Sequence, residues 1–193
     1  MKALSVQLVT NVAQMVTADD REEIFDALGR VLSVRRGRPV ILKRAAFPPN
    51  TASGLWLDRQ DLDILAVRED AASAEHELVI LGHEIWHMME GHCVAHTQAG
   101  PAAARGHSTR LDAVEHVIAL LLASPDERLG DMAHSDLAYA ARTDFEAAVE
   151  EEAERFGLEF ATEMRSFLRT LRRRDPLQVT WRIERSLRQG PRT

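Results

Sequence analysis

The chain has 193 residues, of which 45% are apolar and 5% aromatic, and its formal net charge is −6. This composition allows one domain with a sizeable core of mainly aliphatic side chains, and it excludes a wholly disordered chain. The single cysteine, Cys93, excludes an intrachain disulfide and a thiolate-rich metal site. The longest apolar run, VIALLLA at 117–123, is too short to span a bilayer, so we expect a soluble cytoplasmic protein.

The first part of the chain predicts a helix followed by a small sheet. Apolar residues recur at helical spacing over residues 19–35, and the sequence GRP then ends the helix. Three short strand-like runs follow, separated by FPPNTAS and DRQDLD, at 40–43, 54–57 and 63–67. Their spacing predicts a three-stranded antiparallel meander.

The rest of the chain is predicted to be mostly helical. Ser73 is a suitable N-cap for a helix through HELVILGHEIWHMME, and Gly91 is a suitable end. The following stretch, 93–110, is rich in Ala, Gly and polar residues and favours a loop or an insertion. Further helices are predicted at 111–124, near 134–141 and from about 143 to 174.

The stretch HEIWHMMEGH, residues 83–92, contains the clearest chemical motif of the chain. His83 and His87 stand four residues apart, so on a helix their rings share one face and can hold one divalent ion. Glu84 can then take a proton from water as a general base, which is the HExxH arrangement of metallopeptidases. The alternative is a helix with two solvent-facing histidines. The apolar LVILG before the motif disfavours it, because buried histidines need partners.

A third ligand has to come from outside this motif. The metzincin pattern would place Gly at 90 and His at 93, where this chain has Glu90 and Cys93, so that class is excluded. His92 follows the expected helix end at Gly91. It is therefore better placed to support a ligand or the helix end than to bind the metal.

Carboxylates on the predicted C-terminal helix are the other candidates. At helical spacing, one face carries Glu150, Ala153, Phe156, Gly157, Phe160 and Ala161. This face is small and apolar except for Glu150, and a lone carboxylate there is costly unless it is paired or bound to metal. Glu150 is therefore the predicted third ligand, with Glu146 and Glu152 as alternatives.

With these residues the chain resembles the ImmA/IrrE-type zinc metallopeptidases. Members typically show an HExxH helix followed by Gly-His, as GHEIWHMMEGH does here, and later a helix of the form E-x-E-A-x-x-F-A. The second motif matches EEEAERFG, residues 150–157, with glycine in place of the last alanine. RGRPVIL at 36–42 and GLW at 54–56 are also similar to family versions. The resemblance covers about residues 20–165.

The resemblance implies an α+β, mostly helical zincin-like domain with its small sheet beside the HExxH helix. It implies Zn²⁺ bound by His83, His87 and Glu150, with Glu84 as the catalytic base. Family members commonly act on helix-turn-helix repressors, so the implied substrate is a separate DNA-binding repressor.

The leading functional hypothesis is a zinc-dependent endopeptidase acting on a protein substrate. The alternative is a non-catalytic, metal-containing partner of a transcription regulator, such as an antitoxin or co-regulator. His92 and His116 are both candidates for stabilising the oxyanion, and the sequence does not choose between them. Trp86 stands where relatives often have glycine, and either forms a wall of the substrate cleft or packs in the core. The segment 97–142 is longer than such a fold needs and is a candidate cover for the site.

The C-terminal end of the chain is strongly basic. From Arg165 onward nine arginines accompany two acidic residues, giving +7 there and −13 over the first 164 residues. Such a segment either docks on its own acidic body or contacts nucleic acid, and no basic-aromatic recognition motif accompanies it. We therefore expect a single metallopeptidase-like domain over 1–174, an arginine-rich tail over 175–193, and neither a nucleic-acid nor a membrane partner.

Overall fold

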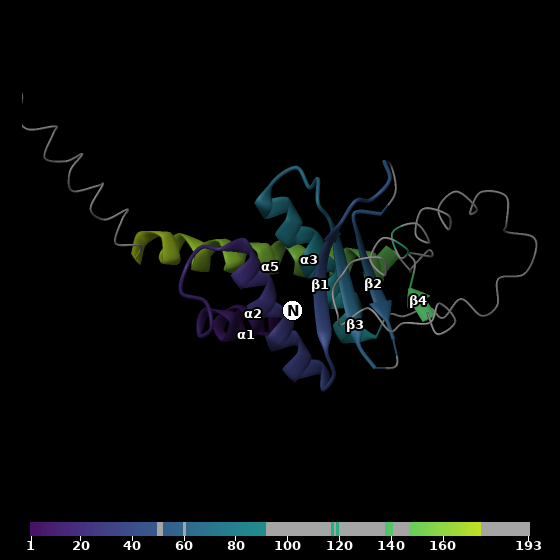
Figure 1. Cartoon of the computed structure of the whole chain (residues 1–193), viewed down its shortest axis with the longest axis horizontal. Helices are drawn as coiled ribbons and strands as arrows, with labels where there is room; N and C mark the ends of the chain where they lie inside the picture. The colour runs from purple at the N-terminus through teal and green to yellow at the C-terminus, as the bar shows by residue number, and fades with distance from the viewer. Residues whose placement is uncertain are drawn as a thin grey trace, which may run out of the picture.

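The computed structural model describes residues 1–49, 52–59, 61–91, 117, 119, 138–140 and 147–174. The chain combines helices with one sheet, in agreement with the predicted α+β class, and the four long described helices pack on one side of the sheet (Figure 1). In chain order the elements are α1 (Lys2–Ala13), α2 (Arg21–Arg36), β1 (Val40–Ala45), β2 (Gly54–Asp58), β3 (Asp63–Arg68), α3 (Ala74–Glu90), β4 (Ala138–Ala140) and α5 (Ala147–Arg174).

The ends of α2 and α3 follow from their capping residues. The side chain of Asp20 accepts a backbone N–H at the start of α2, and that of Ser73 does the same for α3. Gly37 and Gly91 end the two helices with φ values of 70° and 69°, in the left-handed region that glycine adopts without strain. Both helices are confirmed close to their predicted bounds.

The sheet is mixed, so the prediction of a three-stranded antiparallel meander is wrong. The strand order is β1-β3-β2-β4, with β1 parallel to β3 and the other pairs antiparallel. β3 and β2 are the two interior strands of this order, and all residues of each except the last are buried, as expected for strands paired at both edges and covered on both faces. The spacing of the strands along the chain carries no such information.

The fourth strand corrects a second prediction. A helix was expected near 134–141, but residues 138–140 form β4 and pair with β2, with Tyr139 opposite Leu57. This short segment is placed by its pairing with β2 rather than by its own helical propensity.

Alternation along the strands divides the core into two parts. On one face Trp56, Leu65 and Val67 pack with apolar residues of α1, α2, α3 and α5. On the other face Leu57 and Ile64 belong to a second buried cluster that includes Val117. Val117 and Ala119 are helical, in agreement with the predicted helix over 111–124, whose other residues lie outside the described part of the chain.

The N-terminal segment forms α1, for which the sequence reasoning made no prediction. Leu8, Val9 and Val12 are buried in the main core, and α1 packs against α2 and α5. Among the described helices, none has a stretch both long and apolar enough to cross a membrane.

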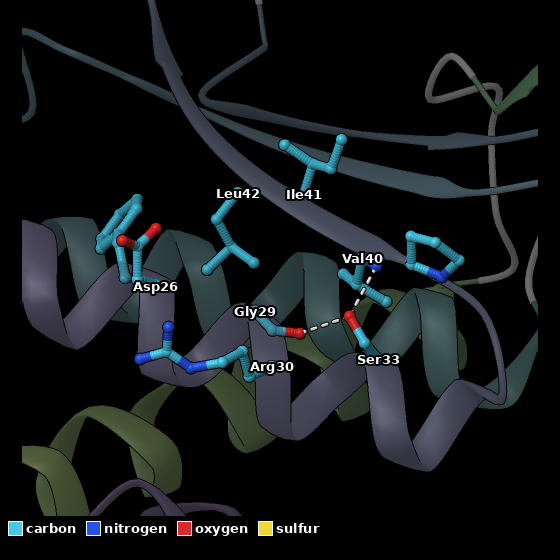
Figure 2. A pocket seen from close by; sticks show the side chains of 9 residues that line it. Asp26, Gly29, Arg30, Ser33, Val40, Ile41 and Leu42 are labelled. Atoms are coloured by element: carbon cyan, nitrogen blue, oxygen red, sulfur yellow. Dashed lines mark hydrogen bonds between the residues drawn. The ribbon is translucent and has the colours of Figure 1, made fainter. Parts of the chain in front are cut away.

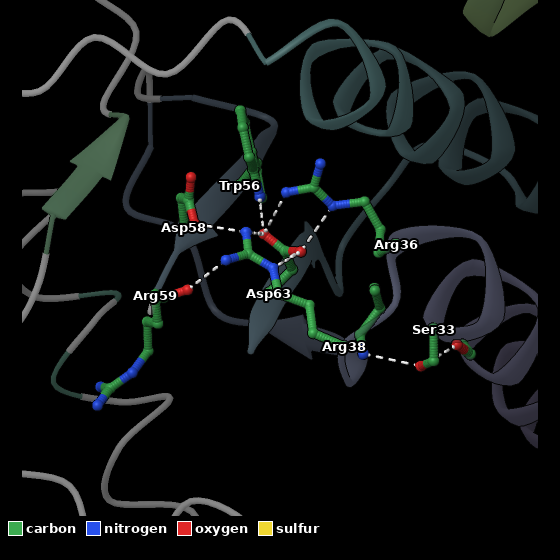
Figure 3. Close-up of polar contacts among 9 residues, drawn as sticks. Ser33, Arg36, Arg38, Trp56, Asp58, Arg59 and Asp63 are labelled. Atoms are coloured by element: carbon green, nitrogen blue, oxygen red, sulfur yellow. Dashed lines mark hydrogen bonds and ion pairs between the residues drawn. The ribbon is translucent and has the colours of Figure 1, made fainter. Parts of the chain in front are cut away.

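An arginine clamp, made of Arg36, Arg38 and Asp63, ties the end of α2 to the sheet (Figure 3). The fully buried carboxylate of Asp63 accepts hydrogen bonds from Arg36 Nε at 2.9 Å, from Arg38 Nε at 2.7 Å and from Trp56 Nε1 at 2.8 Å. Burial by itself would raise the pKa of Asp63, but these hydrogen bonds together lower it below its usual value. The clamp therefore fixes β2 relative to β3 and to the end of α2.

Candidate metal centre

Helix α3 places two histidines of the HExxH motif side by side. His83 and His87 are one helical turn apart and are 5% and 3% exposed. Their rings meet edge to face with centroids 4.7 Å apart, and their Nε2 atoms are 3.0 Å apart. Two ring nitrogens that converge in this way can share one proton or bind one cation.

Glu150 reaches the same point from α5. One carboxylate oxygen lies 3.6 Å from His83 Nε2, and the other lies 3.6 Å from His87 Nε2. Within the described part of the chain, these three residues form a group whose ligand atoms all lie within 4.8 Å of one another. The structure thus brings together the three residues that the sequence predicted as ligands.

The spacing of these donor atoms fits a small tetrahedral cation. Zinc bonds to imidazole nitrogen and carboxylate oxygen are about 2.0–2.2 Å long, which separates neighbouring donors by about 3.3–3.5 Å in a tetrahedron. The two ring nitrogens are 3.0 Å apart, and each lies 3.6 Å from a different oxygen of Glu150, so the observed separations are close to that value. Two histidines and one glutamate also leave a fourth position for water or substrate, as catalytic zinc sites do.

The close approach of α3 and α5 is possible because glycines face each other. A Cβ added to Gly82 would lie 2.9 Å from Gly157 Cα, and one added to Gly157 would lie 2.6 Å from the carbonyl oxygen of Val79. Both distances are far below an ordinary contact, so the two backbones nearly touch. This crossing holds α5 near enough to α3 for Glu150 to reach the two histidines.

The predicted apolar face of α5 supports the same arrangement. Ala153, Phe156, Phe160 and Ala161 are buried, as their spacing predicted, and Met164 continues the row. Glu150 is the polar head of this face, and its side chain remains 30% exposed. A carboxylate with this exposure can serve as a ligand at the edge of the core without the full cost of burial.

Glu84 lies beside the ligand group without belonging to it. It is 5% exposed and points toward the sheet, where Gly54 of β2 approaches its side chain. A Cβ at Gly54 would lie 2.7 Å from both Cγ and Oε1 of Glu84. Nothing in the sequence predicted this contact except the glycine that opens the run GLWL.

The remaining predicted site residues are placed as follows. Trp86 is 7% exposed and packs against Phe156 with ring centroids 5.1 Å apart. Of the two predicted alternatives for Trp86, the structure therefore shows packing in the core. Glu152 is exposed and is not in the ligand group. His92, His116 and Glu146 lie outside the described residues, as do the tail at 175–193 and nearly all of the segment 97–142.

A shallow pocket of about 180 Å³ lies elsewhere, between α2 and the outer edge of β1 (Figure 2). There the hydroxyl of Ser33 donates to the carbonyl of Gly29 and accepts the backbone N–H of Val40. Because Val40 belongs to a strand at the edge of the sheet, this bond occupies a group that would otherwise be available for pairing. None of the pocket's lining residues belongs to the ligand group.

Comparison with known proteins gives no family: no family model, no curated protein and no solved structure matches the chain. The resemblance to the ImmA/IrrE-type metallopeptidases therefore stays a prediction from the motifs. The candidate site rests on the geometry of His83, Glu84, His87 and Glu150 alone.

Proposed function

We propose that the protein is a zinc-dependent endopeptidase of the HExxH type. The observation that carries this proposal is the convergence of His83 and His87 on α3 with Glu150 on α5, at donor separations of 3.0 and 3.6 Å. A zinc ion supplies a Lewis acid that polarises a peptide carbonyl and acidifies water. Zinc is chosen over magnesium or calcium because those ions prefer all-oxygen ligand sets.

The protein's own residues divide the work in this mechanism. His83, His87 and Glu150 would hold the ion, and a set of three protein ligands would leave a coordination position for water or substrate. Glu84 accepts the proton of the attacking water and later returns it to the amine that leaves. Glu84 suits this task by its position, because it directly follows His83 on α3 and is buried with it.

The proposed substrate is a separate protein, a helix-turn-helix transcriptional repressor. This part of the proposal rests on the motif resemblance, whose members commonly act on such repressors. The competing function is a metal-containing binding partner of a regulator, which needs the three ligands but not a base at Glu84.

Replacing Glu84 with glutamine separates the two functions. The protein, loaded with zinc, is incubated with a lysate of its source organism, and the new protein N-termini are identified by terminal labelling and mass spectrometry. We expect wild type, but not Glu84→Gln, to generate new termini in a DNA-binding protein. Glu151→Gln is the matched control, because Glu151 is an exposed neighbour of Glu150 that pairs with Arg155. Identical sets of termini from wild type and Glu84→Gln would refute the peptidase function and favour the binding partner.

A further inference from the structure

β2 and α3 approach each other closely beside the candidate site, at Gly54 and Glu84. Gly54, the first residue of β2, sits against Glu84 and Ile80, which are one turn apart on α3. A Cβ at this position would lie 2.7 Å from Glu84 Cγ, 2.7 Å from Glu84 Oε1 and 2.8 Å from Ile80 Cγ2. No side chain other than hydrogen fits there while Glu84 keeps its present conformation.

The strand beneath Glu84 is held firmly in place. Gly54 is paired with Val67 in the antiparallel ladder of β2 and β3. Two residues further along, Trp56 is buried and donates its indole N–H to Asp63 of the arginine clamp. Because the backbone of β2 is fixed at both points, a group added at Gly54 displaces the side chains above it rather than the strand.

The groups that would have to move differ from those at the other crowded glycines. At Gly157 and Gly82 the nearest atoms belong to backbone, whereas at Gly54 all three nearest atoms belong to side chains. Glu84 Oε1 is the end of a flexible chain, whereas Glu84 Cγ and Ile80 Cγ2 lie nearer to the backbone of α3. A larger residue at 54 therefore has to displace the side chain of Glu84, including its carboxylate, and to push against Ile80.

From these contacts we infer that Gly54 is a positioning residue that fixes the carboxylate of Glu84 beside the metal ligands. The inference rests on the proposed function, in which Glu84 accepts a proton next to the bound ion. Gly54 acts by leaving a space in which the Glu84 side chain lies. His83, His87 and Glu150 have no contact with that space among the three nearest atoms, so metal binding should not depend on it.

The test compares zinc content with the binding of acetohydroxamate, a small zinc chelator whose hydroxamic proton a neighbouring carboxylate accepts. Zinc-loaded wild type, Gly54→Ala, Glu84→Gln and Gly29→Ala are titrated by calorimetry. Gly29→Ala is the matched control, because it adds a Cβ at 3.1 Å from the carbonyl oxygen of Val40, away from the ligand group. We expect all four proteins to hold about one zinc, since their ligands are intact.

Gly54→Ala is expected to bind acetohydroxamate at least about tenfold more weakly than wild type, close to Glu84→Gln, because both lose a hydrogen bond to a charged group. Gly29→Ala should bind as wild type does. Wild-type affinity in Gly54→Ala, together with weak binding in Glu84→Gln, would overturn the role of Gly54 and leave the proposed base intact. Wild-type affinity in Glu84→Gln would instead refute the proposed base, and the role of Gly54 with it. Loss of zinc from Gly54→Ala would also overturn the inference.

A second variant keeps the test decisive if Gly54→Ala does not fold. Gly54→Ala combined with Ile80→Ala removes the collision with Ile80 Cγ2 and keeps the one with Glu84. This double variant should bind acetohydroxamate at least about tenfold more weakly than Ile80→Ala alone. Equal affinities of the double and single variants would overturn the inference.

Discussion

Replacing Gly157 with alanine is expected to destabilise the protein, although alanine normally stabilises a helix relative to glycine. At an uncrowded helix position this exchange raises the free energy of unfolding by about 1 kcal/mol. At Gly157 the new Cβ would lie 2.6 Å from the carbonyl oxygen of Val79, whereas ordinary contacts begin near 3.4 Å. That oxygen belongs to the backbone of α3 and cannot rotate away, so α5 has to move outward.

The size of the effect follows from two opposing contributions. Overpacking of a close-packed interior costs about 1–3 kcal/mol. After the helical gain is subtracted, the expected net loss is about 1 kcal/mol and at most about 2 kcal/mol. Glu150 lies two helical turns before Gly157, about 10 Å along the axis, so movement of α5 also carries the carboxylate away from the histidines. Zinc affinity should fall, because metal–ligand distances tolerate changes of only about 0.2 Å.

Urea unfolding of the zinc-free proteins measures the first effect, and zinc titration measures the second. Gly29→Ala is the control: it lies in the interior of α2, and its nearest contact would be a milder 3.1 Å. We expect Gly157→Ala to unfold at lower urea than Gly29→Ala, with an unchanged slope. If Gly157→Ala were about 1 kcal/mol more stable than wild type and bound zinc equally well, the close crossing of α3 and α5 would be refuted.

Two further predictions concern stability. The pKa of Asp63 is lowered in the folded state, so its ionised carboxylate stabilises the fold. This contribution to the free energy of unfolding is fully present above the ordinary aspartate pKa, and it is lost as pH falls through the lower pKa of the folded state. Asp63→Asn should therefore lower the free energy of unfolding by about 3 kcal/mol near pH 7. On acidification below about pH 4 the variant should lose less stability than wild type does, as measured by urea unfolding at a series of pH values. We use the lower end of the range for breaking a buried ion pair, because the side chains of Arg36 and Arg38 remain 22% and 23% exposed. If wild type and Asp63→Asn lost equal stability on acidification, the stabilising role of the Asp63 carboxylate would be refuted. Zinc at about 100 times its dissociation constant should add about 2.7 kcal/mol to the unfolding free energy, and a chelator should remove it. The unfolding free energy of His87→Ala should not rise when zinc is added. If it rose as much as that of wild type, His87 would be excluded as a ligand.

The predictions that succeeded depended on local chemistry. Ser73, Gly91 and the four-residue spacing of His83 and His87 act within one helix, so the sequence was sufficient to place them. The position of Glu150 beside the two histidines was predicted from a distant segment, because a single carboxylate on a row of small apolar residues requires an explanation, and its role as a ligand stays a prediction.

The features that the sequence did not reveal depend on contacts between distant segments. The strand order depends on β3 pairing with both β1 and β2, which neither the spacing nor the apolar pattern of the runs specifies. The space at Gly54 and the arginine clamp on Asp63 exist only once β2, β3 and α3 are assembled. The available signals for the clamp were far apart in the chain: an aspartate at the head of an apolar strand, and two arginines 27 and 25 residues before it in RGRP.

The most direct test of the central claim is the metal content of the purified protein. Wild type, His87→Ala, Glu150→Ala and the control Glu151→Ala are supplied with zinc, freed of excess and analysed by mass spectrometry for metals. We expect about one zinc per chain in wild type and Glu151→Ala, and less than about one tenth of that in the two ligand variants. Full zinc content in Glu150→Ala would show that α5 does not supply the third ligand. A zinc-free wild type would contradict the metal centre itself.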